Sequence, residues 1–139
     1  MKYSSIFGYI GAIIGILLGL YYILIVAMFI NPWDSLAFLG SIIFSISGLF
    51  AIKLSSKDTE MAAFLFLVSG LGIFITMVGS VKIISFILFA IAAALEFRNK
   101  NKIKINDINQ RRKLIIFQFI IVLLIPLLYF IQSFYIINP

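Results

Sequence analysis

The sequence predicts an all-α protein, a polytopic bundle of five transmembrane helices with the N-terminus inside and the C-terminus outside. Hydrophobic residues make up 63% of the 139 residues and charged residues only 12%, whereas a soluble domain is about half apolar and about a quarter charged. A chain of this length cannot shield so much apolar surface from water. The apolar residues form long stretches, which must be helical in a bilayer because lipid offers no partners to backbone N–H and C=O groups.

The first span is predicted over residues 6–30, a stretch of 25 residues without a charge. The apolar core of a signal peptide is shorter, about 7–15 residues, and a small-residue cleavage site follows it. No such site follows Ile30. We therefore expect a retained first span, which is tilted because it is longer than a hydrocarbon core of ~30 Å.

Four further apolar stretches predict the remaining spans. The fourth span is the shortest, and Gly79-Ser80 supplies the turn before it, because residues 61–97 as one helix would be about 55 Å long. The alternative is four spans, with residues 81–97 lying at the membrane interface or re-entering from one side. The spans predicted after the first cover residues 35–53, 61–79, 81–97 and 114–136.

Small residues recur at helical spacing in the first three spans. Gly11, Gly15 and Gly19 follow one another at every fourth position and so share one helix face. Such a face lets another helix approach closely, and it meets either a span of the same chain or a second copy of the protein. The helix-packing residues that we predict are Gly11, Gly15, Gly19, Ser41, Ser45, Gly48, Ser69, Gly72 and Thr76.

The last span differs from the others because it contains neither Gly nor Ala and carries Pro126 near its middle, which predicts a kink. We expect a peripheral helix that either faces lipid or packs its bulky side chains against a partner. The predicted organisation is a compact four-helix transmembrane bundle over residues 1–98, a basic cytoplasmic linker over residues 99–113, and a fifth transmembrane helix over residues 114–139.

The basic residues predict the orientation. With the N-terminus inside, the cytoplasmic segments contain ten of the eleven Lys and Arg residues, and the outside segments contain only Lys82. Each inside segment contributes, in agreement with the positive-inside rule. The rule also favours five spans, because the basic residues of 98–113 would otherwise lie outside.

Residues 98–113 contain seven basic residues and one acidic residue, a net charge of +6. A basic segment beside a membrane attracts anionic headgroups, here on the cytoplasmic face; alternatively, these charges only fix the topology. Nucleic acid is not an expected partner, because the segment has no aromatic residue to stack on bases. The predicted contacts with anionic lipid are Arg98, Lys100, Lys102, Lys104, Arg111, Arg112 and Lys113.

The residue types that are missing exclude several kinds of site. The chain has no His and no Cys, which excludes disulfides, thiol nucleophiles, histidine bases and Cys/His metal sites. No charged residue lies in the middle of a predicted span, where ion-coupled transporters usually carry one. Asp58 and Glu96 lie near span ends, where we expect either a charge cluster or solvated interfacial ion pairs. We therefore expect no enzyme, no metal and no cofactor.

Three motifs lie within residues 1–98: the glycine series of the first span, the string GLFAIK at residues 48–53, and the string SGLG at residues 69–72. A basic residue, Arg98, ends the fourth span. With these motifs, residues 1–98 resemble a family of small, uncharacterised, Gly-rich bacterial membrane proteins with four spans. The resemblance implies architecture and no activity. The basic linker and the fifth span depart from the pattern of that family.

From these features we expect a non-catalytic integral membrane protein that acts by helix–helix interaction, as an accessory subunit or a small protective protein of the immunity or envelope-stress kind. The alternative is an oligomeric channel or small transporter, with the hydroxyls of Ser69 and Thr76 lining a pore. The expected location is the plasma membrane of a bacterium or archaeon. The expected partners are the bilayer itself and either a membrane protein or further copies of the chain.

Overall fold

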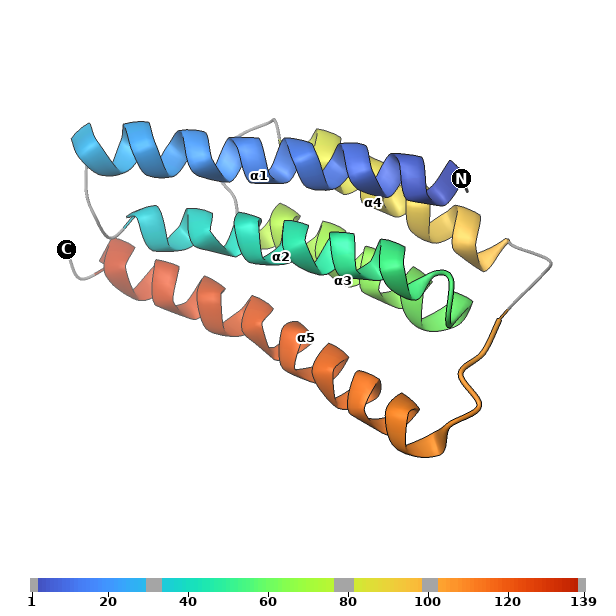
Figure 1. Ribbon diagram of the computed structural model, residues 1–139. Helices are drawn as coiled ribbons and strands as arrows, with labels where there is room; N and C mark the ends of the chain where they lie inside the picture. Colours follow the sequence, from blue (N-terminus) through green and yellow to red (C-terminus); the bar gives the residue numbers. More distant parts are fainter. Residues whose placement is uncertain (1–2, 30–33, 77–81, 99–102, 138–139) are drawn as a thin grey trace.

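The computed structural model describes residues 3–29, 34–76, 82–98 and 103–137, and every regular element in these ranges is a helix (Figure 1). The all-helical class predicted from the sequence is therefore confirmed for this part of the chain. Its five helices are α1 (Tyr3–Phe29), α2 (Asp34–Leu54), α3 (Thr59–Thr76), α4 (Lys82–Phe97) and α5 (Ile108–Ile137).

Helices α1 to α4 form an antiparallel bundle, in which each helix packs against the next in sequence and α4 packs against α1. Helix α5 lies outside this ring, against α2 and α3. The start of α1, the α2–α3 turn, the end of α4 and the start of α5 all lie at one end of the molecule (Figure 1). We call it the basic end, because its exposed basic residues are Lys53, Lys57, Arg98, Lys104, Arg112 and Lys113.

Three buried phenylalanine rings fill the centre of the bundle, and each enters a notch left by a glycine. Phe89 of α4 lies directly against Gly48 of α2, where a Cβ atom would overlap its ring, and Phe44 of α2 lies against Gly72 of α3 in the same way. A Cβ atom on Gly8 would lie 2.7 Å from Cε1 of Phe66. The glycines are therefore needed for the rings to reach the centre.

Serine hydroxyls join the helices between these rings. The Ser41 hydroxyl donates to the carbonyl of Gly15 at 2.9 Å, and the Ser85 hydroxyl donates to the carbonyl of Gly11 at 3.2 Å. Ser47 and Ser69 share a hydrogen bond of 2.7 Å between α2 and α3. These serines are all buried, so their hydroxyls join neighbouring helices in the interior of the bundle.

The predicted packing residues for which the structure describes the side chain all lie at interfaces inside the bundle. Gly15 of α1 contacts the Ser45 hydroxyl of α2, and Gly19 is buried as well. These faces meet other helices of the same chain in this structure. Thr76 closes α3, and its side chain lies outside the described residues.

Two helical segments of the described residues are long and apolar enough to cross a membrane by length and composition, Tyr3–Tyr21 and Ile108–Ile131. The segments Leu39–Leu54 and Thr59–Ile75 are apolar but shorter. Helix α4 has 16 residues and rises ~24 Å, less than a hydrocarbon core of ~30 Å. The described residues thus form five helices, of which two are long and apolar enough to span a membrane, and five spans stay a prediction.

Helix α5 begins at Ile108, six residues before the boundary at Leu114 that was expected from hydropathy. Asp107 precedes the first turn, and its carboxylate accepts a hydrogen bond of 3.0 Å from the N–H of Asn109. An aspartate in this position satisfies an N–H group that has no partner inside the helix. The basic residues Arg111, Arg112 and Lys113 therefore belong to a helix, and the expected linker 99–113 is shorter than predicted.

The contact between Gly15 and Ser45 gives a direct test of the packing. A methyl group added by Gly15→Ala would overlap the Ser45 hydroxyl, so we expect a loss of roughly 1–3 kcal/mol in the free energy of unfolding in detergent. The Ser45 hydroxyl has no hydrogen-bond partner among the described residues. Ser45→Ala alone should therefore be neutral or stabilising, and the double substitution should recover most of the loss.

Thermal unfolding of the four proteins of this cycle supplies the measurement. Ala94→Val is the control, since it adds carbon atoms at an exposed position of α4 and should leave the midpoint nearly unchanged. If Gly15→Ala lowers the unfolding midpoint equally in the wild-type protein and in the Ser45→Ala variant, the two residues are not in contact.

Candidate functional site at the basic end

Asp58 lies in the turn between α2 and α3 and caps helix α3. Its side chain is fully buried. Its Oδ1 atom accepts a hydrogen bond of 3.2 Å from the N–H of Met61, and its carbonyl accepts the N–H of Ala62 at 3.1 Å. This is the ordinary geometry of an aspartate N-cap. The negative charge also lies at the positive end of the α3 dipole, where it is stabilised.

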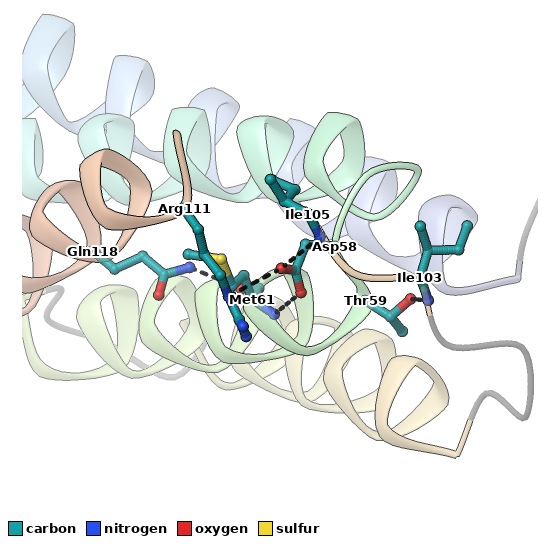
Figure 2. A network of polar contacts seen from close by, with 7 residues as sticks. All are labelled: Asp58, Thr59, Met61, Ile103, Ile105, Arg111 and Gln118. Atoms are coloured by element: carbon teal, nitrogen blue, oxygen red, sulfur yellow. Dashed lines mark hydrogen bonds and ion pairs between the residues drawn. The ribbon is translucent and has the colours of Figure 1, made fainter. Parts of the chain in front are cut away.

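The segment that leads to α5 returns to this cap (Figure 2). The N–H of Thr59 donates to the carbonyl of Ile103 at 3.0 Å, and the N–H of Ile103 donates to the Thr59 hydroxyl at 3.1 Å. The N–H of Ile105 donates to Oδ2 of Asp58 at 3.4 Å. Residues 103–105 are therefore fixed on the start of α3 by three hydrogen bonds.

Two side chains of α5 complete the cluster. The Nε atom of Arg111 lies 3.6 Å from Oδ2 of Asp58, and Figure 2 shows the guanidinium reaching from α5 toward the turn. About two turns further along α5, the side-chain amide of Gln118 is buried and donates a hydrogen bond of 2.9 Å to the carbonyl of Met61. We call the group of Asp58, Thr59, Met61, Ile103, Ile105, Arg111 and Gln118 the α5 clamp.

A second buried acid lies at the same end, on α4. The Glu96 side chain is 1% exposed, and its Oε1 atom accepts a hydrogen bond from the Ser4 hydroxyl at the start of α1. Asp58 is 0% exposed. The sequence left open a charge cluster or solvated ion pairs here; solvated pairs are wrong for Asp58 and Glu96, because each carboxylate is enclosed by the helices that it joins.

The basic residues predicted to contact lipid behave in two ways. Arg98, Lys104, Arg112 and Lys113 are exposed at the basic end. Arg111 is different, because its side chain is 28% exposed and turns toward Asp58. Lys100 and Lys102 lie outside the described residues. The structure therefore divides the predicted set into exposed cations and one cation that holds α5.

The α5 clamp attaches α5 to the bundle. It contains one carboxylate and one guanidinium, and both are used in contacts between α3, α5 and the segment before α5. Within the part of the chain that the structure describes, no group of three metal-ligating side chains comes together. What the cluster does physically is to fix the start of α5 on the bundle through buried polar contacts.

Sequence reasoning missed the α5 clamp, although two signals for it were present. Asp58 and Asp107 each stand directly before a helix, which is the position that aspartate favours as an N-cap. Gln118 is a polar residue in an otherwise apolar span, and such groups find a partner when they are buried. The partners themselves could not be predicted, because 53 positions of chain separate Asp58 from Arg111.

No protein-family model, no curated protein and no solved structure matches this chain. The resemblance of residues 1–98 to small Gly-rich four-span membrane proteins therefore stays a prediction.

The α5 clamp predicts unequal effects for two neighbouring arginines. Arg111→Gln removes the cation beside the buried Asp58 carboxylate, and we expect a loss of roughly 1–3 kcal/mol in unfolding free energy. Arg112→Gln makes the same change in charge at an exposed position and should have little effect. Hydrogen exchange should also quicken in residues 103–118 of the Arg111 variant, while α1 and α2 stay protected. Similar behaviour of the two variants would contradict the clamp.

Proposed function

We propose that this protein is a multi-pass membrane protein without catalytic activity, which acts by helix–helix interaction in the plasma membrane of a bacterium or archaeon. The observation that carries the proposal is the apolar outer surface of the bundle. The interior combines an apolar core with buried serine hydroxyls, Gln118 and two carboxylates, and every helix also exposes large apolar side chains. Examples are Leu17 at 61% exposed, Ile46 at 55%, Phe64 at 46%, Ile84 at 50% and Leu123 at 65%. Water disfavours such a surface, and lipid does not.

The distribution of charge supports an orientation with the N-terminus inside and the C-terminus outside. The described basic residues other than Lys82 gather at the basic end, and Lys82 lies at the start of α4, away from that end. Lys82 is held there over the ring of Phe74, with its Nζ atom 4.7 Å from the ring centre. A membrane normal parallel to the bundle would place the basic end in the cytoplasm, as the positive-inside rule favours.

Five spans are part of the proposal although α4 is short. A long basic side chain stands at each end of α4, Lys82 at its start and Arg98 just after its end. Such side chains can keep their charge at the membrane interface while their stems lie in the hydrocarbon region. A mismatch of a few ångströms is accommodated by such side chains and by local thinning of the bilayer. Helix α4 is also packed between α1 and α3, so its crossing follows from theirs.

Helix α5 is the element that we propose for contact with a partner. Its main contacts in the described part of the chain are with α2 and α3, and it leaves Phe119 65%, Leu123 65% and Phe130 67% exposed. A membrane-protein partner packed on this face would make the chain an accessory subunit or a small protective protein. The exposed cations at the basic end would hold anionic headgroups beside it.

The alternative of a channel or small transporter has less support. A pore formed by the hydroxyl faces would need those hydroxyls to face water. The hydroxyl of Ser69 instead bonds to Ser47 and to the carbonyl of Leu65 at 2.8 Å, and its side chain is fully buried. Interior hydroxyls of this kind stabilise helix contacts.

Cysteine accessibility tests the topology, because the native chain has no Cys. A single Cys at Asn109, at the basic end, should stay unlabelled by an impermeant reagent added outside intact cells. A single Cys at Lys82 should be labelled. Labelling at Asn109 would overturn the proposed orientation. Release of the protein from membranes by alkaline carbonate would overturn the membrane location itself.

Site-specific photocrosslinking tests the role of α5. A crosslinking amino acid at Leu123 should give one protein adduct of fixed mass, whereas the same group at Leu17, equally exposed on α1, should give none. Crosslinks from both positions alike would contradict a partner face on α5. Solute or ion flux in liposomes that Thr76→Leu abolishes would favour the channel instead.

A further inference from the structure

The crevice between α2 and α5 has the form of a lipid site. Near the basic end, a cavity of about 140 Å³ is lined by Phe50, Lys53, Leu54, Lys57, Gln110 and Leu114. Next to it, a second cavity of about 350 Å³ follows the two helices away from the basic end. Its lining residues are Ile43, Ile46, Ser47, Phe50, Phe117, Ile120, Ile121 and Leu124. Phe50 belongs to both linings, so the two cavities adjoin.

The chemistry changes along this crevice from cationic to apolar. Lys53 and Lys57 are exposed, and Gln110 adds an amide group beside them. In the second cavity the only polar side chain is Ser47, and its hydroxyl is used by Ser69 and by the carbonyl of Phe44 at 2.7 Å. The walls of both cavities are therefore apolar, and two exposed lysine side chains stand at the end of the crevice near the basic end.

The dimensions agree with one leaflet of a bilayer. The ten-residue step from Ile43 to Lys53 on α2 rises ~15 Å, which is about half of a hydrocarbon core of ~30 Å. The ring of Phe50 packs on that of Phe117 with a centroid distance of 5.3 Å, which joins α2 to α5 at the point where the two cavities adjoin. The walls are thus braced across the crevice.

We propose that this crevice binds one anionic phospholipid, with the phosphate group between Lys53 and Lys57 and an acyl chain along Ile46 and Ile120. The inference rests on the proposed membrane location and goes beyond it. An apolar crevice open to lipid is filled by hydrocarbon, and two lysines at its interfacial end select a negative headgroup by charge complementarity. Neither lysine belongs to the basic segment 98–113, so this site is separate from the general attraction of that segment.

Native mass spectrometry of the full chain released from detergent micelles tests the site. Wild-type protein with phosphatidylglycerol should keep one bound lipid, and phosphatidylcholine should be retained far less. Lys53→Gln with Lys57→Gln should weaken retention about tenfold or more, from the loss of two cations near the headgroup. The control, Lys82→Gln, removes a cation at the start of α4, outside both cavities, and should change retention little.

A second pair of variants tests the apolar part of the site without a change in charge. Ile46→Trp should fill the crevice and expel the acyl chain, and because Ile46 is 55% exposed the bundle should still fold. Leu17→Trp, on the exposed side of α1, is its control. Weakening by Lys82→Gln as large as that caused by Lys53→Gln with Lys57→Gln, or unchanged binding in Ile46→Trp, would overturn the site. Protein dimers in place of the lipid adduct would also overturn it, with a second copy as the occupant.

The outcome is distinguishable from failure of the proposed function. Protein that resists carbonate extraction but carries no phosphatidylglycerol would contradict the lipid site alone. Protein that leaves the membrane fraction would contradict the membrane location on which both depend.

Discussion

The rest of the bundle depends on the fit of phenylalanine rings into glycine notches. Phe66 of α3 reaches Gly8 of α1, and Phe89 of α4 reaches Gly48 of α2, so both rings cross the bundle between helices that are not neighbours in the ring. The two rings meet at its centre, 6.3 Å apart. Lipid gives helices no hydrophobic reason to associate, so close packing must supply the attraction. A notch that admits a large ring gives more such contact than a flat helix face.

Composition was sufficient to predict the helices, and glycine spacing predicted packing faces without indicating which side chains fill them. A series of glycines at every fourth residue indicates close approach of another helix. The pattern is identical whether a backbone, a hydroxyl group or an aromatic ring packs against the glycines. The structure has Ser45 against Gly15 and Leu88 and Phe89 against Gly11. The predicted span began at Leu114 because hydropathy assigns the basic residues 111–113 to a loop. In the structure the helix already begins at Ile108, where Asp107 caps it and Arg111 contacts Asp58. Pairings over such sequence distances depend on the assembled fold.

The α5 clamp explains how a helix with a mostly exposed surface keeps one position. Its contacts with α3 are polar and directional at the basic end, while its contacts with α2 are apolar and centred on Phe50 and Phe117. A buried carboxylate is costly unless it is paired and hydrogen-bonded. Asp58 meets both conditions, since two N–H groups and Arg111 surround it. In the proposed orientation Asp58 lies near the headgroup region, where such a charge costs less than at mid-membrane.

The surfaces of α5 therefore differ in the contacts that they make. The α3 side is held by the hydrogen bond of Gln118 and by the ion pair of Arg111 with Asp58, so α5 cannot turn about its axis without losing both. The α2 side has no such bonds in the described crevice and leaves room that hydrocarbon can occupy. The outward side presents Phe119, Leu123 and Phe130 in a fixed direction. A partner that packs there meets a helix whose rotation is already set, so less conformational entropy is lost on association.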